Sequence, residues 1–434
     1  MPPRLEIQPQ RSRVDEDLAF VITGADPGAI LDIEVSVQDG ALREWCSHAT
    51  FRVDSEGIID LRRQAPLPGS SWSGVDPLGP LWSMTPKDPS AFFTRTRAWA
   101  LTYHAVIRHD GKQITETTFT RHFGDEVCRE EVHQGPIVGT IHRPDDDQPR
   151  PGVILLAGSD GANLEAAGSL LAGHGYTVLS LNWFKAEGRP PDLVRIPLED
   201  LDAAVDYLAG HPFVSTSQIA LIGLSRGAEL ALQVAADHAG VGLVVAGAPS
   251  SIRQPGVTAN YRFDQPAWIR DGKPLGFVPA KGGAFSAALG WLRSVILGRP
   301  MRQRQMFLTA LRRSRPEAEI EVERIRGPIV LISGLDDGLW PSADYAQRIV
   351  QRLRSRGWQG QVRDERIPRA GHFVAFPYAI ASLPAMIQIT PSPRFTIDFG
   401  GDPEGNAQAA SRSWGIILDA LSTWAAEERL SPAT

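Results

Sequence analysis

A serine flanked by two glycines stands between a short apolar run and a segment rich in alanine and leucine. Residues 219–222 are apolar, the next five read Gly223-Leu-Ser225-Arg-Gly227, and helix-forming residues follow without a break. So tight a turn needs glycine, because a Cβ at either glycine position would clash. The pattern predicts a strand, a sharp turn and a helix that leave the Ser225 hydroxyl bare on the turn, which is the geometry of a nucleophile elbow.

The residues around this motif alternate between strand and helix patterns. Alternating strands and helices form a mostly parallel, doubly wound sheet. Right-handed crossovers then bring the carboxyl ends of the strands, and any site, to one edge of that sheet. Strands are predicted at residues 153–157, 178–182, 218–222, 243–247, 329–333 and 362–367, and helices at 164–174, 198–209, 226–236, 343–354 and 413–427.

The first part of the chain has a different pattern. Apolar and polar residues alternate over residues 31–37, and shorter strand-like runs follow, separated by Gly, Pro and Asp. Several short strands at this spacing predict a β-sandwich. We therefore expect an α/β protein in which a β-sandwich domain, residues 1–145, precedes a doubly wound, mostly parallel α/β domain, residues 146–434.

Residues 250–325 break the alternation of strands and helices and are expected to form a cap-like insertion. A basic run from Arg302 to Arg315 lies within it. This run is either a solvated, charged helix face or a set of contacts to an anionic substrate tail, and the sequence leaves the role of the insertion open.

Composition narrows the possible partners. The net charge of −6 gives no reason to expect nucleic acid, and no apolar run approaches the roughly 18 residues of a membrane span. Two cysteines and the lack of an apolar signal segment favour a cytoplasmic protein.

No histidine pair has metal-ligand spacing, and Gly158-Ser-Asp-Gly161 lacks a full dinucleotide fingerprint, so we expect no metal and no cofactor. The oligomeric state is left open.

Two further motifs follow predicted strands and complete the argument for Ser225. Gly334-Leu-Asp336-Asp337 comes after one strand, and Gly371-His372 comes after the next. The chain order Ser, Asp, His is the order found in α/β-hydrolases. His372 is predicted to take the Ser225 proton, and an aspartate to hold its Nδ1–H. Asp337 is preferred because it lies three residues after Gly334, and Asp336 is the alternative.

A tetrahedral oxyanion also needs two hydrogen-bond donors. The backbone N–H of Arg226, directly after the nucleophile, is expected to be one of them. The other is expected from the loop at residues 157–162, with Ser159 as the first choice and Asp160 as the second.

With these motifs the chain resembles the acyl-CoA thioesterases related to bile acid-CoA:amino acid N-acyltransferase, over nearly its whole length. The resemblance implies a β-sandwich followed by an α/β-hydrolase catalytic domain, with the second aspartate of the acid loop, Asp337, as the triad acid. The motifs that carry it are the loop at residues 75–84, Gly158 to Glu165, Gly223 to Glu229, Gly334 to Asp337 with Trp340, and Gly371-His372 with Pro377-Tyr378.

The resemblance also implies a reaction. Members of this family attack an acyl-CoA thioester, form an acyl-enzyme and pass the acyl group to water or to an amine, and serine as the nucleophile favours hydrolysis. Asp160 and Ala162 stand where the family often has glycines, so the oxyanion loop is expected to differ.

The leading hypothesis is therefore a serine acyl hydrolase that cleaves a small-molecule acyl thioester, with acyl-CoA as substrate, through an acyl-Ser225 intermediate. Coenzyme A then takes part only as a portion of the substrate. Acyl transfer to an amine or hydroxyl acceptor of a small metabolite is the alternative. An ester or peptide hydrolase and a non-catalytic ligand-binding protein are two others, and the acyl chain is left open.

Overall fold

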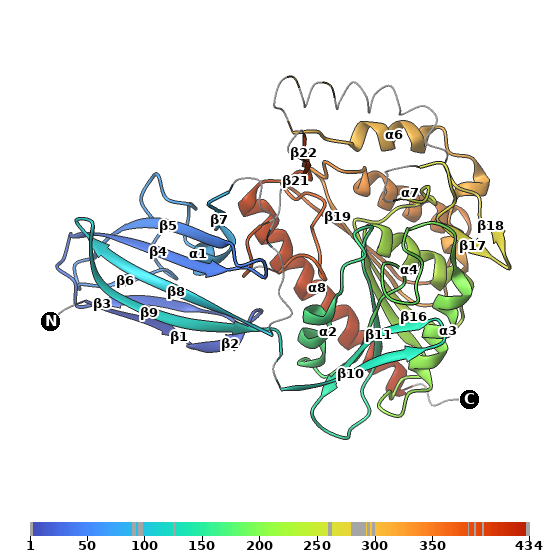
Figure 1. Cartoon of the computed structure of the whole chain (residues 1–434), viewed down its shortest axis with the longest axis horizontal. Coiled ribbons are helices and arrows are strands. Elements are labelled where there is room, and N and C mark those ends of the chain that lie inside the picture. The colour runs from blue at the N-terminus through green and yellow to red at the C-terminus, as the bar shows by residue number, and fades with distance from the viewer. Residues whose placement is uncertain are drawn as a thin grey trace.

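A computed structural model of the chain contains an elongated β-structure beside a larger α/β body (Figure 1). It describes residues 3–88, 93, 99–124, 126–258, 263–278, 292, 296, 300–380, 382–385, 388–392 and 395–430. Part of the insertion predicted at residues 250–325 therefore lies outside the described residues.

The elongated part consists of two β-sheets that pack against each other. Phe20 and Phe119, one from each sheet, meet edge to face with ring centroids 5.5 Å apart. The smaller sheet has the order β1-β3-β6, with β1 Arg4–Gln8, β3 Ala19–Thr23 and β6 Ile59–Asp60. The larger has the order β2-β9-β8-β4-β5-β7, with β2 Arg11–Arg13, β4 Ile30–Gln38, β5 Glu44–Arg52, β7 Thr85–Pro86, β8 Ala100–His109 and β9 Lys112–His122.

The α/β body is built on one eight-stranded sheet. Its order is β10-β11-β13-β12-β15-β16-β19-β20, and the strands from β13 to β20 run parallel. The predicted α/β fold with a mostly parallel sheet is therefore confirmed. The strands are β10 Val127–Gln134, β11 Ile137–Pro144, β12 Gly152–Leu156, β13 Thr177–Leu181, β15 Ile219–Leu224, β16 Val241–Gly247, β19 Ile329–Gly334 and β20 Val362–Ile367.

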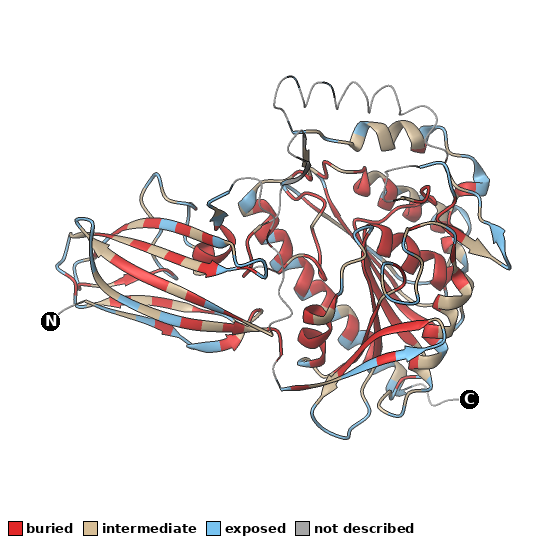
Figure 2. Ribbon diagram, viewed as in Figure 1, coloured by how far each residue is buried: buried red, intermediate tan, exposed pale blue. Residues whose placement is uncertain are grey.

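Helices cover both faces of this sheet. Val153 and Leu155 of β12 pack in one apolar cluster with α2 and α8, while Ile154 and Leu156 pack in another with α3, α4 and α7. Burial on both faces explains why β12, β15 and β16 are continuous apolar runs (Figure 2). The helices are α1 Gly79–Trp82, α2 Glu165–Ala172, α3 Leu198–Ala209, α4 Arg226–Asp237, α6 Arg304–Arg312, α7 Ser342–Ser355 and α8 Pro403–Leu430.

Short elements complete the described chain. Two 3-10 turns lie at Pro316–Ala318 and Val322–Arg324, and the remaining strands are β14 Ile196–Pro197, β17 Trp268–Arg270, β18 Lys273–Pro274, β21 Gln388–Ser392 and β22 Phe395–Asp398. Within the described ranges, no helix has both the length and the apolar character that crossing a bilayer requires.

Sheet membership changes earlier than the boundary predicted at residue 145. Strands β10 and β11 form a hairpin, and β11 pairs antiparallel with β13 of the eight-stranded sheet. The last strand of the two N-terminal sheets is β9, which ends at His122. The sequence did not reveal this, because the alternation of a hairpin is the same whichever sheet it joins.

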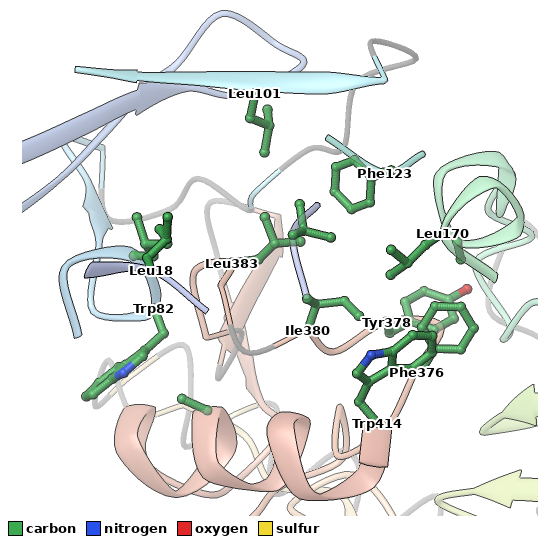
Figure 3. Packing of buried hydrophobic residues seen from close by; sticks show 14 of the residues in the cluster. Leu18, Trp82, Leu101, Phe123, Leu170, Phe376, Tyr378, Ile380, Leu383 and Trp414 are labelled. Atoms are coloured by element: carbon green, nitrogen blue, oxygen red, sulfur yellow. The ribbon is translucent and has the colours of Figure 1, made fainter. Parts of the chain in front are cut away.

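The N-terminal sheets and the α/β body share one apolar cluster. Leu18, Trp82 and Leu101 from the first part meet Leu170, Phe376 and Trp414 from the second (Figure 3). Helix α8 therefore packs between the two parts of the molecule as well as on the sheet.

A buried carboxylate joins the same two parts. Asp15 accepts hydrogen bonds from Arg13, from His174 at the end of α2 and from Trp414 Nε1 of α8. Burial opposes ionisation, but the hydrogen bonds and charges of His174 and Arg13 outweigh it and lower the pKa of Asp15 to about 2. This carboxylate is therefore ionised, and it links α2 and α8 to the N-terminal strands.

Candidate active site

Ser225 occupies the turn between β15 and α4, with φ of 60° and ψ of −118°. This conformation is strained for a residue with a side chain and is typical of the serine in a nucleophile elbow. The two glycines are required by space as well. A Cβ on Gly223 would lie 2.2 Å from Gly227 O, and one on Gly227 would lie 2.2 Å from Leu156 O of the neighbouring strand.

The Ser225 backbone is anchored while its hydroxyl is not. Its N–H donates to Gly247 O at 2.9 Å, and its carbonyl accepts from Glu229 N at 3.0 Å. Among the described residues the Ser225 Oγ atom has no hydrogen-bonding partner, although only 6% of the residue is exposed. The amino end of α4 lies directly behind it and favours negative charge at this position.

His372 and Asp337 form a buried pair in the loops that follow β20 and β19. His372 Nδ1 lies 2.9 Å from Asp337 Oδ2, and neither residue is more than 2% exposed. The other carboxylate oxygen accepts from Leu339 N at 2.9 Å and from Trp340 N at 3.1 Å. These bonds orient the carboxylate toward Nδ1 and leave Nε2 as the ring nitrogen available for proton transfer.

Asp336, the alternative acid, points elsewhere. Its carboxylate pairs with Arg302 and accepts from Gly401 N, and 46% of its side chain is exposed. The structure therefore brings Asp337, not Asp336, to His372.

An aromatic residue connects the acid loop to the elbow edge of the sheet. The Trp340 ring packs against His372 with centroids 5.5 Å apart, and its Nε1 donates to Ala248 O, just past β16, at 3.1 Å. Strand β16 pairs with β15, which ends at the Ser225 turn. The side chains of Ser225 and His372 themselves form no hydrogen bond.

The predicted oxyanion loop is held by a residue that sequence reasoning did not single out. Gly158 N donates to Tyr378 Oη at 3.0 Å, and Tyr378 Oη donates to Asp160 Oδ1 at 2.5 Å. Lys185 Nζ binds the carbonyl of Asp160 at 3.1 Å. The only sequence signal was that Tyr378 belongs to the histidine-loop motif, because its partners lie more than 200 residues away.

The N–H groups proposed for the oxyanion are not used elsewhere. Among the described residues, the backbone N–H groups of Arg226, Ser159 and Asp160 donate to no acceptor. The N–H of Gly158 is engaged by Tyr378 and is not available. Geometry therefore leaves both Ser159 and Asp160 as partners for Arg226.

The Arg226 side chain has a separate, structural task. It is fully buried, donates to Glu229 Oε2 at 2.9 Å and to Gln254 O at 3.3 Å, and lies over the Trp268 ring. Burial raises the pKa of Glu229, whose Oε1 accepts from Trp268 Nε1 at 2.7 Å. This pair ties the start of α4 to the segment after β16, a connection that the sequence did not reveal.

The described part of the insertion covers the acid loop. Phe307 of α6 packs on Trp340 with ring centroids 5.8 Å apart. Arg302 pairs with Asp336 and Asp398, and Arg304 pairs with Asp344, so these two arginines have partners within the chain. Three exposed arginines form no ion pair with any described residue, namely Arg312, Arg313 and Arg315. For these three, both a solvated helix face and contacts to an anionic substrate tail stay open.

A metal site is not evident in the part of the chain that the structure describes, where no three His, Cys, Asp or Glu side chains converge. The expectation of no metal and no cofactor stays a prediction.

Comparison with known proteins adds family information. The family model described as "BAAT / Acyl-CoA thioester hydrolase C terminal" matches residues 196–423, and "Acyl-CoA thioester hydrolase/BAAT N-terminal region" matches residues 15–134. Acyl-coenzyme A thioesterase 1 of Homo sapiens is 28% identical over 92% of this chain and 91% of its own length. Acyl-coenzyme A thioesterase 6 of Mus musculus is 29% identical over 95% and 94%. A putative dienelactone hydrolase from Klebsiella pneumoniae has a TM-score of 0.40 and 14% identity over 68% of this chain and 98% of its own.

Proposed function

The chain belongs to the BAAT / acyl-CoA thioester hydrolase family, and on that premise we propose that it is a serine acyl hydrolase that cleaves an acyl-CoA thioester. The relatives described above are named acyl-coenzyme A thioesterases, which supports the substrate class. The observation that carries the proposal is the buried hydrogen bond between His372 and Asp337, in loops at the sheet edge where the Ser225 turn lies.

The reaction follows from the roles of the three side chains. Ser225 Oγ gives its proton to His372 Nε2 and attacks the thioester carbonyl, forming a C–O bond. The C–S bond then breaks, and the coenzyme A sulfur leaves with the proton from His372. Water next loses a proton to His372 and attacks the Ser225 ester, and the carboxylic acid is released as Ser225 regains its proton.

Two charges develop during this reaction, a positive charge on His372 and a negative charge on the oxyanion, and a protein group stabilises each of them. Asp337 stabilises the imidazolium of His372 without taking its proton. The backbone N–H groups of Arg226 and of Ser159 or Asp160 donate to the oxyanion, and losing one such donor typically costs about 10²–10³ in turnover.

The test combines thiol release with intact-protein mass after mixing with a panel of acyl-CoA substrates. The wild type is expected to release thiol and to carry an acyl adduct on Ser225. Ser225→Ala should lose the adduct and roughly 10⁴-fold or more of the turnover. Ser47→Ala, which removes another buried serine hydroxyl bonded at Pro80 O, is the matched control. Unchanged turnover in Ser225→Ala would end the proposal.

Acyl transfer is the second candidate, because the family description names BAAT alongside the thioester hydrolases. The first half of the reaction is the same, and an amine or hydroxyl replaces water in the second. Product masses recorded with added amines and hydroxyl compounds separate the two, since transfer gives an amide or ester and hydrolysis gives only the free acid. p-Nitrophenyl esters test a simple ester hydrolase in the same assay.

We also propose that the β-sandwich and the α/β-hydrolase part are separate domains. The two family models, which match residues 15–134 and 196–423, support this division. A cytoplasmic location stays a proposal too, since one Homo sapiens relative is named as mitochondrial.

A further inference from the structure

We propose that Gln254 is a positioning residue for the reaction and holds the acid loop in place relative to the start of α4, directly behind Ser225. The inference rests on the proposed function and adds a residue that acts through others. Gln254 ends a segment that begins at Ala248, just past β16, and is buried throughout; we call it the 248–254 segment. A buried loop has to satisfy its polar groups inside the protein.

The backbone of Gln254 binds the first turn of α4. Its N–H donates to Glu229 Oε1 at 3.2 Å, and its carbonyl accepts from the Arg226 guanidinium at 3.3 Å. Arg226 directly follows Ser225, and Glu229 N donates to Ser225 O at 3.0 Å. The backbone of Gln254 is therefore fixed relative to the turn that carries the proposed nucleophile.

The side chain of Gln254 binds a different element, helix α7. Its Nε2 donates to Tyr345 Oη at 2.9 Å and to Ser250 Oγ at 3.2 Å. Tyr345 is fully buried, and its ring packs edge to face on Trp340 of the acid loop with centroids 5.9 Å apart. Gln254 therefore connects the start of α4 to the residue that packs against the candidate histidine.

Trp340 joins this connection to His372 and to the other end of the 248–254 segment. The rings of Trp340 and His372 pack with centroids 5.5 Å apart, and Trp340 Nε1 donates to Ala248 O at 3.1 Å. Ala248 has a φ of 44°, a left-handed conformation that a residue with a side chain keeps only when its surroundings enforce it. The segment thus holds Trp340 twice, directly at Ala248 and through Tyr345 at Gln254.

Hydrogen bonds give this arrangement a role that apolar packing would not fill. An apolar side chain in place of Gln254 could occupy the same space without fixing the orientation of Tyr345, whereas satisfied buried polar networks rigidify the groups they join. The ring of His372 has to come within hydrogen-bonding distance of Ser225 Oγ to take its proton. A displacement of about 1 Å in such a group can cost roughly 100-fold in rate.

Gln254→Met gives the sharpest test, because it keeps the length of the side chain and removes its N–H donors. We expect kcat to fall about tenfold and KM to change less than about twofold, since the bonds of Gln254 go to protein groups. Gln233→Met is the matched control. Gln233 is also 3% exposed, and its side chain bonds Asp237 and Arg253 rather than the acid loop. This control should lower stability in chemical unfolding and keep the wild-type kcat.

Tyr345→Phe removes the other partner of the same hydrogen bond and keeps the ring that packs on Trp340. It should lower kcat by a similar factor. A variant with both Gln254→Met and Tyr345→Phe should lose about tenfold rather than about 100-fold, because both substitutions remove one shared bond. Thiol release gives kcat and KM for each variant, and circular dichroism checks that each is folded.

Three results would overturn the role of Gln254. They are a kcat within about twofold of wild type in folded Gln254→Met and Tyr345→Phe, an equal loss in Gln233→Met, or losses that multiply in the double variant. Ser225→Ala in the same assay separates this failure from failure of the proposed function. If Ser225→Ala is inactive while Gln254→Met keeps its kcat, only the role of Gln254 is removed, whereas wild-type turnover in Ser225→Ala overturns both.

Discussion

The turn that carries Ser225 and the loops that carry Asp337 and His372 lie at one edge of the sheet, yet they are stabilised differently. The turn is fixed by neighbouring backbone, since a Cβ on Gly223 would overlap Gly227 O and one on Gly227 would overlap Leu156 O. The loops are fixed by side chains from distant segments, with Asn406 of α8 on Gly371 and Trp340 on Ala248. The geometry of the turn should therefore survive changes elsewhere in the molecule, whereas the geometry of the loops depends on the packing of α8.

The largest expected effect tests the loops. Asp337→Asn should keep the fold but lower kcat roughly 10⁴-fold, because an amide favours the wrong tautomer of His372. Asp336→Asn changes a neighbouring carboxylate that pairs with Arg302 at the surface, and it should leave kcat within about twofold. Steady-state thiol release on both variants checks the prediction, and equal losses would contradict the assignment of Asp337.

The next effect tests the local constraint at the turn. A Cβ on Gly227 would overlap Leu156 O and Ala157 O, both backbone atoms that cannot rotate away. Gly227→Ala should therefore destabilise the protein by about 1–3 kcal/mol and lower turnover roughly 10²-fold through displacement of Ser225.

Gly415 of α8 provides the matched control for that substitution. It is exposed, and a Cβ there meets no atom within 4 Å. Gly415→Ala should stabilise the protein by about 0.5–1 kcal/mol, because alanine favours a helix. Chemical unfolding of both variants measures the contrast, and similar unfolding curves would show that the elbow does not require glycine.

A smaller effect sharpens the role of the long-range contacts. Tyr378→Phe removes the hydroxyl that accepts from Gly158 and donates to Asp160. Without these two hydrogen bonds the oxyanion loop is held less firmly. We therefore expect kcat to fall roughly tenfold with little change in KM. Tyr103→Phe removes another buried hydroxyl, one bonded to Ser382 O, and should affect stability alone. A larger change in KM than in kcat for Tyr378→Phe would argue against positioning of the loop.

The last prediction concerns stability rather than turnover, and it tests the contact between the two parts of the molecule through pH. The folded-state pKa of Asp15 is about 2, below its ordinary value of 3.8. Its contribution, about 2 kcal/mol, is therefore fully present above pH 4 and lost as the pH falls toward 2. The unfolding free energies of the wild type and Asp15→Asn should differ at pH 5 and converge near pH 2. A constant difference across that range would contradict the link through His174 and Arg13.

The contrast between the turn and the loops also explains how much of the fold and of the candidate site could be predicted from the sequence. The elbow and the alternation of strands and helices depend on neighbouring residues, so the apolar runs and the two glycines were sufficient. The preference for Asp337 over Asp336 followed from its offset in the turn, and the structure brings Asp337 to His372.

What the sequence could not provide depends on long-range packing. Tyr378 and Asn406 act through bonds to Gly158 and Gly371, and no local pattern in the chain marks either contact. The buried pair of Arg226 and Glu229 stood within the elbow motif, yet its partner Trp268 lies 39 residues away. The hairpin of β10 and β11 lies within residues 1–145 of the predicted sandwich domain but belongs to the eight-stranded sheet, since strand pairing is decided by partners distant in sequence.

Helix α8 follows every other element of the site in chain order, and Asn406 near its start holds the loop before His372. During synthesis on the ribosome, the serine turn can therefore form well before the histidine loop receives this support. A nascent chain that has not yet exposed α8 is expected to be inert, so that reactivity arises only after α8 has left the ribosome.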